Sequence, residues 1–146
     1  TNWVWSPNNI GSAQINGIEL TNRISFNENY SAIVNYSWMH AKDNRTKKYL
    51  IYQPNNKADV SLKYTNDGAG VMIELNGHYT DRRFHDAANA TYVKRFFVFG
   101  LSASKKINKS FTCFASIDNL FNRKYQVIRD YPVPGFSLNG GLKAEF

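Results

Sequence analysis

The stretch Asn139–Phe146 reads Asn-Gly-Gly-Leu-Lys-Ala-Glu-Phe and ends the chain on an aromatic residue. Successive side chains of a β-strand point to opposite faces. Leu138, Leu142, Ala144 and Phe146 therefore share one face, and the other face carries Ser137, Asn139, Gly141, Lys143 and Glu145. Soluble domains usually end in a polar, frayed tail. We therefore predict a terminal strand with one apolar and one polar face, while a strand of a soluble sheet remains an alternative.

The same alternation recurs along the chain, most clearly in Val71–Thr80. There, one face carries Val71, Ile73, Leu75 and Tyr79, and the other carries Glu74, Asn76, His78 and Thr80. Similar patterns occupy 31–38 and 58–65, and no segment keeps a helical period, so we predict an all-β chain. We expect one strand over Tyr92–Lys105 that directs Val93 and Phe97 outward. We also expect an irregular first strand over Ile10–Phe26, with Gly17 at a bulge or kink.

The breaks between these strands alternate in length. Short breaks fall at Asn27–Asn29, Asn66–Gly70 and Lys106–Lys109, and long polar ones at Asp43–Asn56, Arg82–Thr91 and Asn122–Pro134. Short turns on one side and long loops on the other are typical of an outer-membrane barrel. The pattern predicts an antiparallel up-and-down transmembrane β-barrel with about seven strands in this chain. With Phe146 on the short-turn side, an odd count places Thr1–Asn9 on the extracellular side, which suggests the C-terminal portion of a larger barrel.

Composition agrees with a barrel wall. Aromatic residues make up 15% of the 146 residues. Mean hydropathy is -0.49, and no apolar run reaches the roughly 18 residues of a transmembrane helix. A transmembrane strand needs only about 9–11 residues, half of which face a polar lumen. The chain opens Thr-Asn-Trp without an initiator Met or a signal-peptide pattern, so we expect a processed chain or part of a longer one.

The net charge of +7 does not indicate nucleic-acid binding, because the basic residues are scattered over predicted loops without a recognition motif. The ordinary interpretation is that these basic side chains lie on solvated loops. The functional alternative is that they contact anionic lipid head groups. The single Cys113 shares an apolar face with Phe111 and Ala115, which predicts a small core filler.

No catalytic, metal or cofactor site is predicted. His40, His78 and His85 are too scattered for a metal-ligand pattern. Ser102, Ser104 and Ser116 lack a His or Asp at a supporting spacing, and they fit lumen-facing positions. No glycine-rich loop joins a strand to a helix as nucleotide binding requires. We therefore expect the chain not to be an enzyme.

Two patterns near the C-terminus resemble known features of bacterial outer-membrane proteins. Asn139, Gly141, Ala144 and Phe146 resemble the signal by which the barrel-assembly machinery recognises bacterial outer-membrane barrels. A second set resembles the closing strands of TonB-dependent outer-membrane transporters: Asn119, Leu120, Phe121, Asn122, Tyr125 and Gly135. Upstream, Asn9–Glu19 is similar to a strand of the same family, in the cobalamin-receptor branch at least as well as in the siderophore branch. Tyr52–Lys57 resembles its Pro-containing lead into a strand.

The resemblance implies that residues 1–146 are the C-terminal portion of a TonB-dependent receptor β-barrel, with the plug domain absent. The family's barrel has about 22 strands around a plugged lumen. Such a receptor is an active transporter of cobalamin, a ferric siderophore or haem in the outer membrane of a Gram-negative bacterium. Its implied partners are outer-membrane lipid, the remaining N-terminal barrel strands and plug, TonB through that plug, and the barrel-assembly machinery. Ligand-binding residues are not assigned, and Asp43–Asn56 and Arg82–Thr91 are the loops of first interest.

Three functional classes stay open at this point: the active transporter, a passive porin or outer-membrane enzyme barrel, and a soluble β-sandwich binding module. In a barrel, interfacial aromatics are expected at Tyr36, Trp38, Tyr64, Tyr79 and Phe146. The lumen face would carry Glu19, Asn35, Asp59, Lys63, Glu74, Asn76, His78, Ser116, Asp118, Lys143 and Glu145. A sandwich would instead bury Leu75, Phe99 and Ala144 between two sheets.

Overall fold

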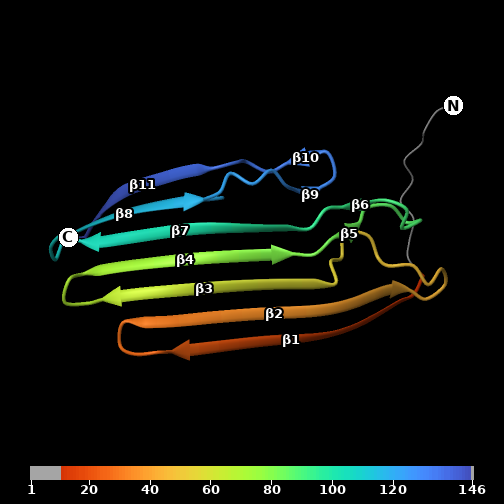
Figure 1. Cartoon of the computed structure of the whole chain (residues 1–146), viewed down its shortest axis with the longest axis horizontal. Coiled ribbons are helices and arrows are strands. Elements are labelled where there is room, and N and C mark those ends of the chain that lie inside the picture. Colours follow the sequence, from red (N-terminus) through yellow and green to blue (C-terminus); the bar gives the residue numbers. More distant parts are fainter. Residues whose placement is uncertain (1–10, 146) are drawn as a thin grey trace.

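The computed structural model describes residues 11–145, and its main element is one seven-stranded antiparallel sheet (Figure 1). Its strands, in spatial order, are β1 (Ala13–Ser25), β2 (Tyr30–Asp43), β3 (Asn56–Asn66), β4 (Val71–Thr80), β7 (Phe96–Lys106), β8 (Phe111–Asp118) and β11 (Ser137–Ala144). Each pairs with its neighbour in chain order, which is an up-and-down topology. The predictions of an all-β chain and about seven wall strands are confirmed.

Two small hairpins lie in the long connections. β5 (Arg83–Phe84) pairs with β6 (Tyr92–Val93), and β9 (Gln126–Ile128) pairs with β10 (Tyr131–Pro132). Figure 1 shows the three short turns together at the left end of the sheet and the long connections together at the right end. The predicted sorting of loop lengths is therefore confirmed. The expected positions of Thr1–Asn9 and Phe146 lie outside the described residues.

The strand register separates polar from apolar side chains in two rows that cross all seven strands. Residues paired in register form one apolar row across all seven strands: Ile24, Ala32, Leu62, Leu75, Leu101, Ile117 and Leu138. The row one position along is wholly polar: Ser25, Ser31, Lys63, Glu74, Ser102, Ser116 and Asn139. Because adjacent residues of a strand face opposite ways, one face of the sheet is mainly apolar and the other mainly polar. Ile33, Val98 and Phe114 are apolar residues on the polar face.

The sheet is a single layer without an enclosed core. Among the described residues, the buried hydrophobic side chains are Ala32, Ala41, Val93 and Phe96, and none of the large side chains is fully buried. Leu75 and Phe99 are half-buried, and Ala144 is exposed. No second sheet packs on either face of the seven strands of residues 11–145. The sandwich alternative is therefore wrong.

Aromatic side chains lie near both ends of the apolar face. Tyr30 and Tyr64 pack with ring centroids 4.9 Å apart near the short turns. Near the long loops, Tyr79 packs on Phe97 at 6.5 Å, and Trp38 lies on the same face. Tyr30 and Trp38 are eight positions apart on β2, which is about 26 Å of strand. That length suits the apolar band of an outer-membrane barrel, about 25 Å tall.

Two sequence expectations were wrong. The pairing of β1 with β2 is regular from end to end, so Gly17 marks no bulge. A Cβ at Gly17 would lie 2.8 Å from the Trp38 carbonyl oxygen, so close strand approach explains this glycine. The expected strand Tyr92–Lys105 is broken at Lys94 and Arg95, because Val93 pairs with Arg83 in the β5–β6 hairpin and is buried there instead of facing outward.

The sheet is an open wall. β1 and β11 each pair on one side only within residues 11–145, and they do not contact each other. Hydrocarbon cannot hydrogen-bond unpaired strand edges, so a sheet that crosses a membrane needs both of its edges paired or covered. Among residues 11–145, no helix has the length and apolar character to cross a membrane.

Candidate functional site

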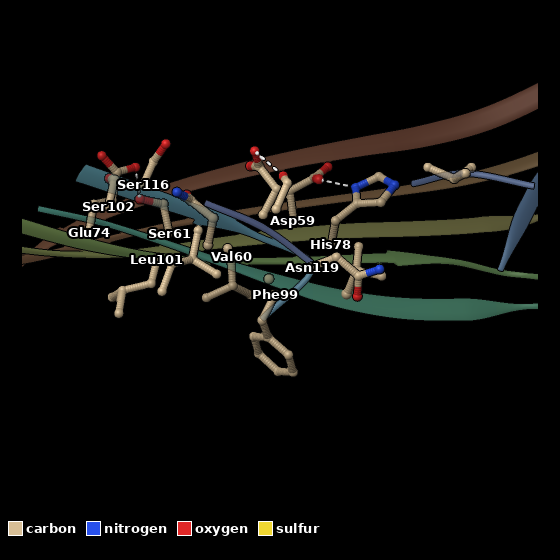
Figure 2. Close-up of a pocket in the computed structure, with 18 of the residues that line it drawn as sticks. Asp59, Val60, Ser61, Glu74, His78, Phe99, Leu101, Ser102, Ser116 and Asn119 are labelled. Carbon is tan, nitrogen blue, oxygen red and sulfur yellow. Dashed lines mark hydrogen bonds and ion pairs between the residues drawn. The ribbon is translucent and has the colours of Figure 1, made fainter. Parts of the chain in front are cut away.

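The polar face of the sheet is hollowed. A cavity of about 630 Å³ spans β2, β3, β4, β7 and β8, and Val133, Pro134, Gly135 and Ser137 also line it. Figure 2 shows Ser61, Glu74, Ser102 and Ser116 pointing to one side of the sheet, whereas Phe99 and Leu101 point to the other. The polar face is thus the concave one, and the apolar face is convex.

The concave face carries a chain of hydrogen bonds between neighbouring strands. The Asp59 carboxylate lies 2.5 Å from His78 Nδ1, and His78 Nε2 lies 2.9 Å from Thr80 Oγ1 (Figure 2 draws the Asp59–His78 contact). This order resembles a hydrolase triad, but Thr80 is only 6% exposed and cannot reach a substrate. Nearby, Ser61 donates to Glu74 at 2.7 Å. The arrangement forms a hydrogen-bonded polar surface on this face of β3 and β4.

The segment between β8 and β11 brings together residues that resemble the family motif. Asn119 is 8% exposed and has a positive φ of 50°. Its Oδ1 accepts from the Arg123 backbone N–H at 2.7 Å, and its Nδ2 donates to the Arg123 carbonyl at 2.9 Å. Asn122, also at φ 50°, accepts from the Phe136 N–H at 3.0 Å. The two asparagines therefore fold this connection into a compact turn, since Asn tolerates the left-handed region and bonds its local backbone.

The remaining motif residues attach that turn to β7. The Leu120 N–H donates to the Phe99 carbonyl at 2.8 Å. The Phe121 ring meets Phe99 edge-on at 5.5 Å, and the Tyr125 ring packs on Phe96 at 4.3 Å. Phe121 is 72% exposed on the outside of the sheet. The motif therefore anchors the connection on both faces of the wall at its long-loop end.

A second, larger cavity of about 1040 Å³ opens at the long-loop end. We call it the rim cavity; residues 90–95 and chain from Asn122 to Gly135 line it. It shares Tyr125, Val133 and Gly135 with the cavity of the concave face, so the two hollows are neighbours. The loop Asp43–Asn56, expected to be of first interest, does not line it, and Arg82–Thr91 contributes only Ala90 and Thr91. The sequence did not lead us to expect that the loop Asn122–Pro134 lines this cavity, although its cluster of basic residues could have indicated a binding surface.

Arg83 joins the two loops that form the rim cavity. Its side chain is 4% exposed and donates to the carbonyls of Gln126 at 2.9 Å and Val127 at 3.1 and 2.5 Å. The guanidinium lies 5.5 Å from the Phe96 ring centroid. Its Nη1 has no hydrogen-bond partner among the described residues. Burial away from water lowers the pKa of Arg83, although the group stays charged at neutral pH.

A polar cluster holds the tip of the β5–β6 hairpin. The Asp86 carboxylate accepts from Thr91 Oγ1 at 2.5 Å, the Ala90 N–H at 3.1 Å and the Thr91 N–H at 2.7 Å. These hydrogen bonds, led by the Thr91 hydroxyl, hold the pKa of Asp86 far below its usual range. His85 Nε2 contacts both Thr91 and the guanidinium of Arg129, which adds a second link to the β9–β10 loop.

The other predicted residues occupy separate places. His40 lies on the convex face between the rings of Trp38 and Tyr49, and it is not part of the polar cluster at His85. Within residues 11–145, His, Cys, Asp and Glu form no group of three that could hold a metal ion. Cys113 is half-buried on the convex side of β8. Asn139 and Gly141 lie on the concave side of β11 and Ala144 on its convex side, while Phe146 lies outside the described residues.

The sequence and the fold match one family of outer-membrane proteins. A family model described as TonB dependent receptor-like, beta-barrel matches residues 1–120. This chain belongs to the TonB-dependent receptor β-barrel family. Members of this family reside in the outer membrane of Gram-negative bacteria, and this assignment places the chain there.

Individual relatives agree with the assignment. The vitamin B12 transporter BtuB of Photobacterium profundum is 27% identical over 129 residues, which are 88% of this chain and 21% of the transporter. The siderophore receptor PiuA of Acinetobacter baumannii superposes with a TM-score of 0.79 at 16% identity, covering 90% of this chain and 22% of the receptor. The pyoverdine receptor FpvA of Pseudomonas aeruginosa gives 0.78 at 14%, covering 92% and 22%. The chain thus spans about a fifth of the length of these TonB-dependent receptor relatives.

Proposed function

We propose that residues 1–146 form the C-terminal barrel wall and several extracellular loops of a TonB-dependent active transporter. The cargo would be a large, scarce nutrient: cobalamin, a ferric siderophore or haem. The observation that carries the proposal is the paired rows through Leu75 and Glu74, apolar on the convex side and polar on the concave side. A wall with lipid outside and a wet lumen inside requires this separation in every strand.

In this proposal the chain works with the rest of the same receptor. The free edges of β1 and β11 pair with the remaining N-terminal barrel strands, and outer-membrane lipid covers the convex face. The concave cavity, with Asp59, Glu74 and His78, faces the plug and holds it by many polar contacts. The plug, in turn, contacts TonB. We propose no catalytic role for this chain, because members of its family are receptors and transporters.

The C-terminal strand is also proposed to be read during assembly. Asn139, Gly141, Ala144 and Phe146 would form the signal bound by the barrel-assembly machinery. Gly141 supports a packing role for part of this set, because a Cβ there would lie 2.7 Å from the Phe114 ring. Truncation of Phe146 in the complete receptor should lower the amount of heat-modifiable, folded barrel in the outer membrane, and substitution of Glu145 by Gln should not.

Transport is tested with the complete receptor that contains this segment. Cells with and without TonB are given labelled cyanocobalamin, a labelled ferric siderophore or labelled haem, and accumulation is measured. The proposal predicts accumulation of one of these nutrients that requires both the receptor and TonB. Equal accumulation without TonB would indicate a passive pore instead. Accumulation of none of the three would overturn the proposed cargo class.

A further inference from the structure

The rim cavity carries a strong excess of positive charge. Five basic side chains line it, and the lining contains one acidic residue, Asp130. The basic residues are Lys94, Arg95, Arg123, Lys124 and Arg129. Asp130 lies 3.5 Å from Arg129 Nε and offsets that charge. Five positive charges less one negative charge leave a net of four within a single hollow.

The other four basic side chains have no acidic partner. Within residues 11–145, neither Lys94, Arg95, Arg123 nor Lys124 forms an ion pair. Residues 1–10 contain no Asp or Glu. The rim cavity is therefore a place where positive charge has been gathered without compensation.

A buried charge behind the cavity adds to the same field. Arg83 is 4% exposed, and all its hydrogen bonds go to carbonyls of Gln126 and Val127 instead of a carboxylate. Its Nη1 is left without a partner in the described chain. A charge in such a poorly hydrated position is weakly screened and raises the potential of the neighbouring hollow.

The cavity is also held in shape and has the size of a ligand site. Arg83 and the His85–Arg129 contact tie the β5–β6 loop to the β9–β10 loop. Tyr92 and Tyr125 supply aromatic surface to the lining, and Tyr125 is fixed against Phe96. A volume of about 1040 Å³ lies at the upper end of ordinary small-molecule pockets. A prearranged hollow loses less entropy when a ligand binds.

We propose that the rim cavity binds a polyanion, a ligand that presents several carboxylate or phosphate oxygens. Such groups form charge-assisted hydrogen bonds with Lys and Arg. An uncharged ligand would displace water from the same cations without forming charge-assisted hydrogen bonds, so the cost of desolvating the cations would not be offset. The inference rests on the proposed function, because that function places the cavity at the extracellular mouth of the barrel. The inference restricts the cavity's ligand, whether cargo or lipid, to an anionic class. The same chemistry is offered by a soluble anionic chelate and by the phosphates of lipopolysaccharide.

The test uses the complete receptor, purified in detergent and stripped of lipopolysaccharide, with inorganic triphosphate as the probe. One variant combines Lys94→Gln, Arg123→Gln and Lys124→Gln. The matched control combines Arg45→Gln, Lys47→Gln and Lys48→Gln, which removes the same charge from exposed residues of another long loop outside the cavity. We expect affinity for triphosphate to fall by at least about tenfold in the cavity variant and to change less than about twofold in the control.

Salt provides a check that needs no variant. Affinity of the unmodified receptor should fall steeply between low and high ionic strength, because the contacts are electrostatic. Absence of triphosphate binding at low salt, or equal losses in the two variants, would overturn the proposal. Cyanocobalamin, which carries no net charge, should bind equally to both variants, and a selective loss of its binding in the cavity variant would also contradict the polyanion assignment.

Two further experiments distinguish a lipid head group from a soluble polyanion, and the cavity assignment from the proposed transport function. Competition by phosphorylated lipid A, with none by its dephosphorylated form, assigns the anion to the lipid head group. Triphosphate binding that lipid A does not displace assigns a soluble polyanion. TonB-dependent accumulation is measured independently in cells, so a receptor that accumulates its nutrient but does not bind triphosphate would refute the cavity assignment while leaving the proposed transport function standing.

Discussion

Asn122 and Gly135 meet across the connection between β8 and β11. Asn122 Oδ1 accepts the Phe136 N–H at 3.0 Å, and a Cβ added to Gly135 would collide with that same oxygen. The glycine is therefore required by a side chain 13 positions earlier, and the turn that carries the basic rim residues depends on it.

Gly135→Ala should destabilise this connection. The added methyl must displace Asn122, which leaves the Phe136 N–H without its acceptor and costs about 1–3 kcal/mol. Loss of folded receptor would be followed by urea unfolding or by the heat-modifiable band on gels. Gly68→Ala is the control, since its Cβ would meet its nearest atom at an ordinary 3.6 Å. Equal stability of the two variants would remove the proposed packing role of Gly135.

Arg83→Lys should loosen the β9–β10 loop without unfolding the wall. Lysine lacks the planar fork that donates to both Gln126 and Val127, so the loop loses its attachment. Limited trypsin digestion after Arg129, the basic residue within this loop, should become several-fold faster. Arg82→Lys serves as the control, because Arg82 is exposed over the Tyr92 ring. Unchanged cleavage in Arg83→Lys would show that the loop is held by other contacts.

Acid should open the β5–β6 hairpin only at very low pH. Hydrogen bonds to Thr91 and Ala90 hold the pKa of Asp86 below that of an unfolded chain. A depressed folded pKa gives stability that is fully present above the unfolded value, near 3.9, and is lost as pH falls through the folded value. Amide exchange at Ala90 and Thr91, corrected for intrinsic rates, should therefore keep its protection from pH 7 to about pH 4. Asp86→Asn should reduce that protection already at pH 7, and an early loss in the parent would contradict the hydrogen-bonded loop.

An introduced positive charge should destabilise the receptor much more at Leu75 than at its neighbour Asn76. Leu75→Arg places a cation on the convex face near the middle of the apolar band, at a cost of about 2–4 kcal/mol in unfolding free energy. Asn76→Arg adds the same side chain to the concave face, where water is available, and should cost less than about 1 kcal/mol. Unfolding of the complete receptor in lipid vesicles measures both. Equal costs would contradict opposite environments for the two faces.

The strands and their faces were predictable because the signal is local. Alternation in Val71–Thr80 assigns each side chain to a face whatever the rest of the chain does. Loop lengths are equally visible in the sequence, which is why the sorting of turns was predicted. Where apolar residues continue past a strand end, the same rule fails. Val93 keeps the alternation of Phe97, yet the chain bends at Lys94 and Arg95 and buries Val93 in a hairpin.

The rim cavity was not predictable because its contacts are not local. Arg83 reaches carbonyls 43 and 44 residues away, and His85 meets Arg129 at a similar separation. No periodicity indicates which long loops will meet. The basic residues of Asn122–Pro134 therefore read as solvated charges until the fold placed them opposite Lys94 and Arg95.

The most direct test of the whole account is the environment of the two faces of the sheet. Single spin labels would be placed at Leu62, Leu75 and Leu101, and at Ser61, Asn76 and Ser102, in a Cys113→Ala receptor reconstituted in bilayers. Collision rates with oxygen, which partitions into lipid, and with a water-soluble nickel chelate would then be compared. We predict that oxygen dominates at the three leucine positions and that the ratio reverses at the three polar positions. Similar ratios at both sets would contradict a wall that separates lipid from a wet lumen.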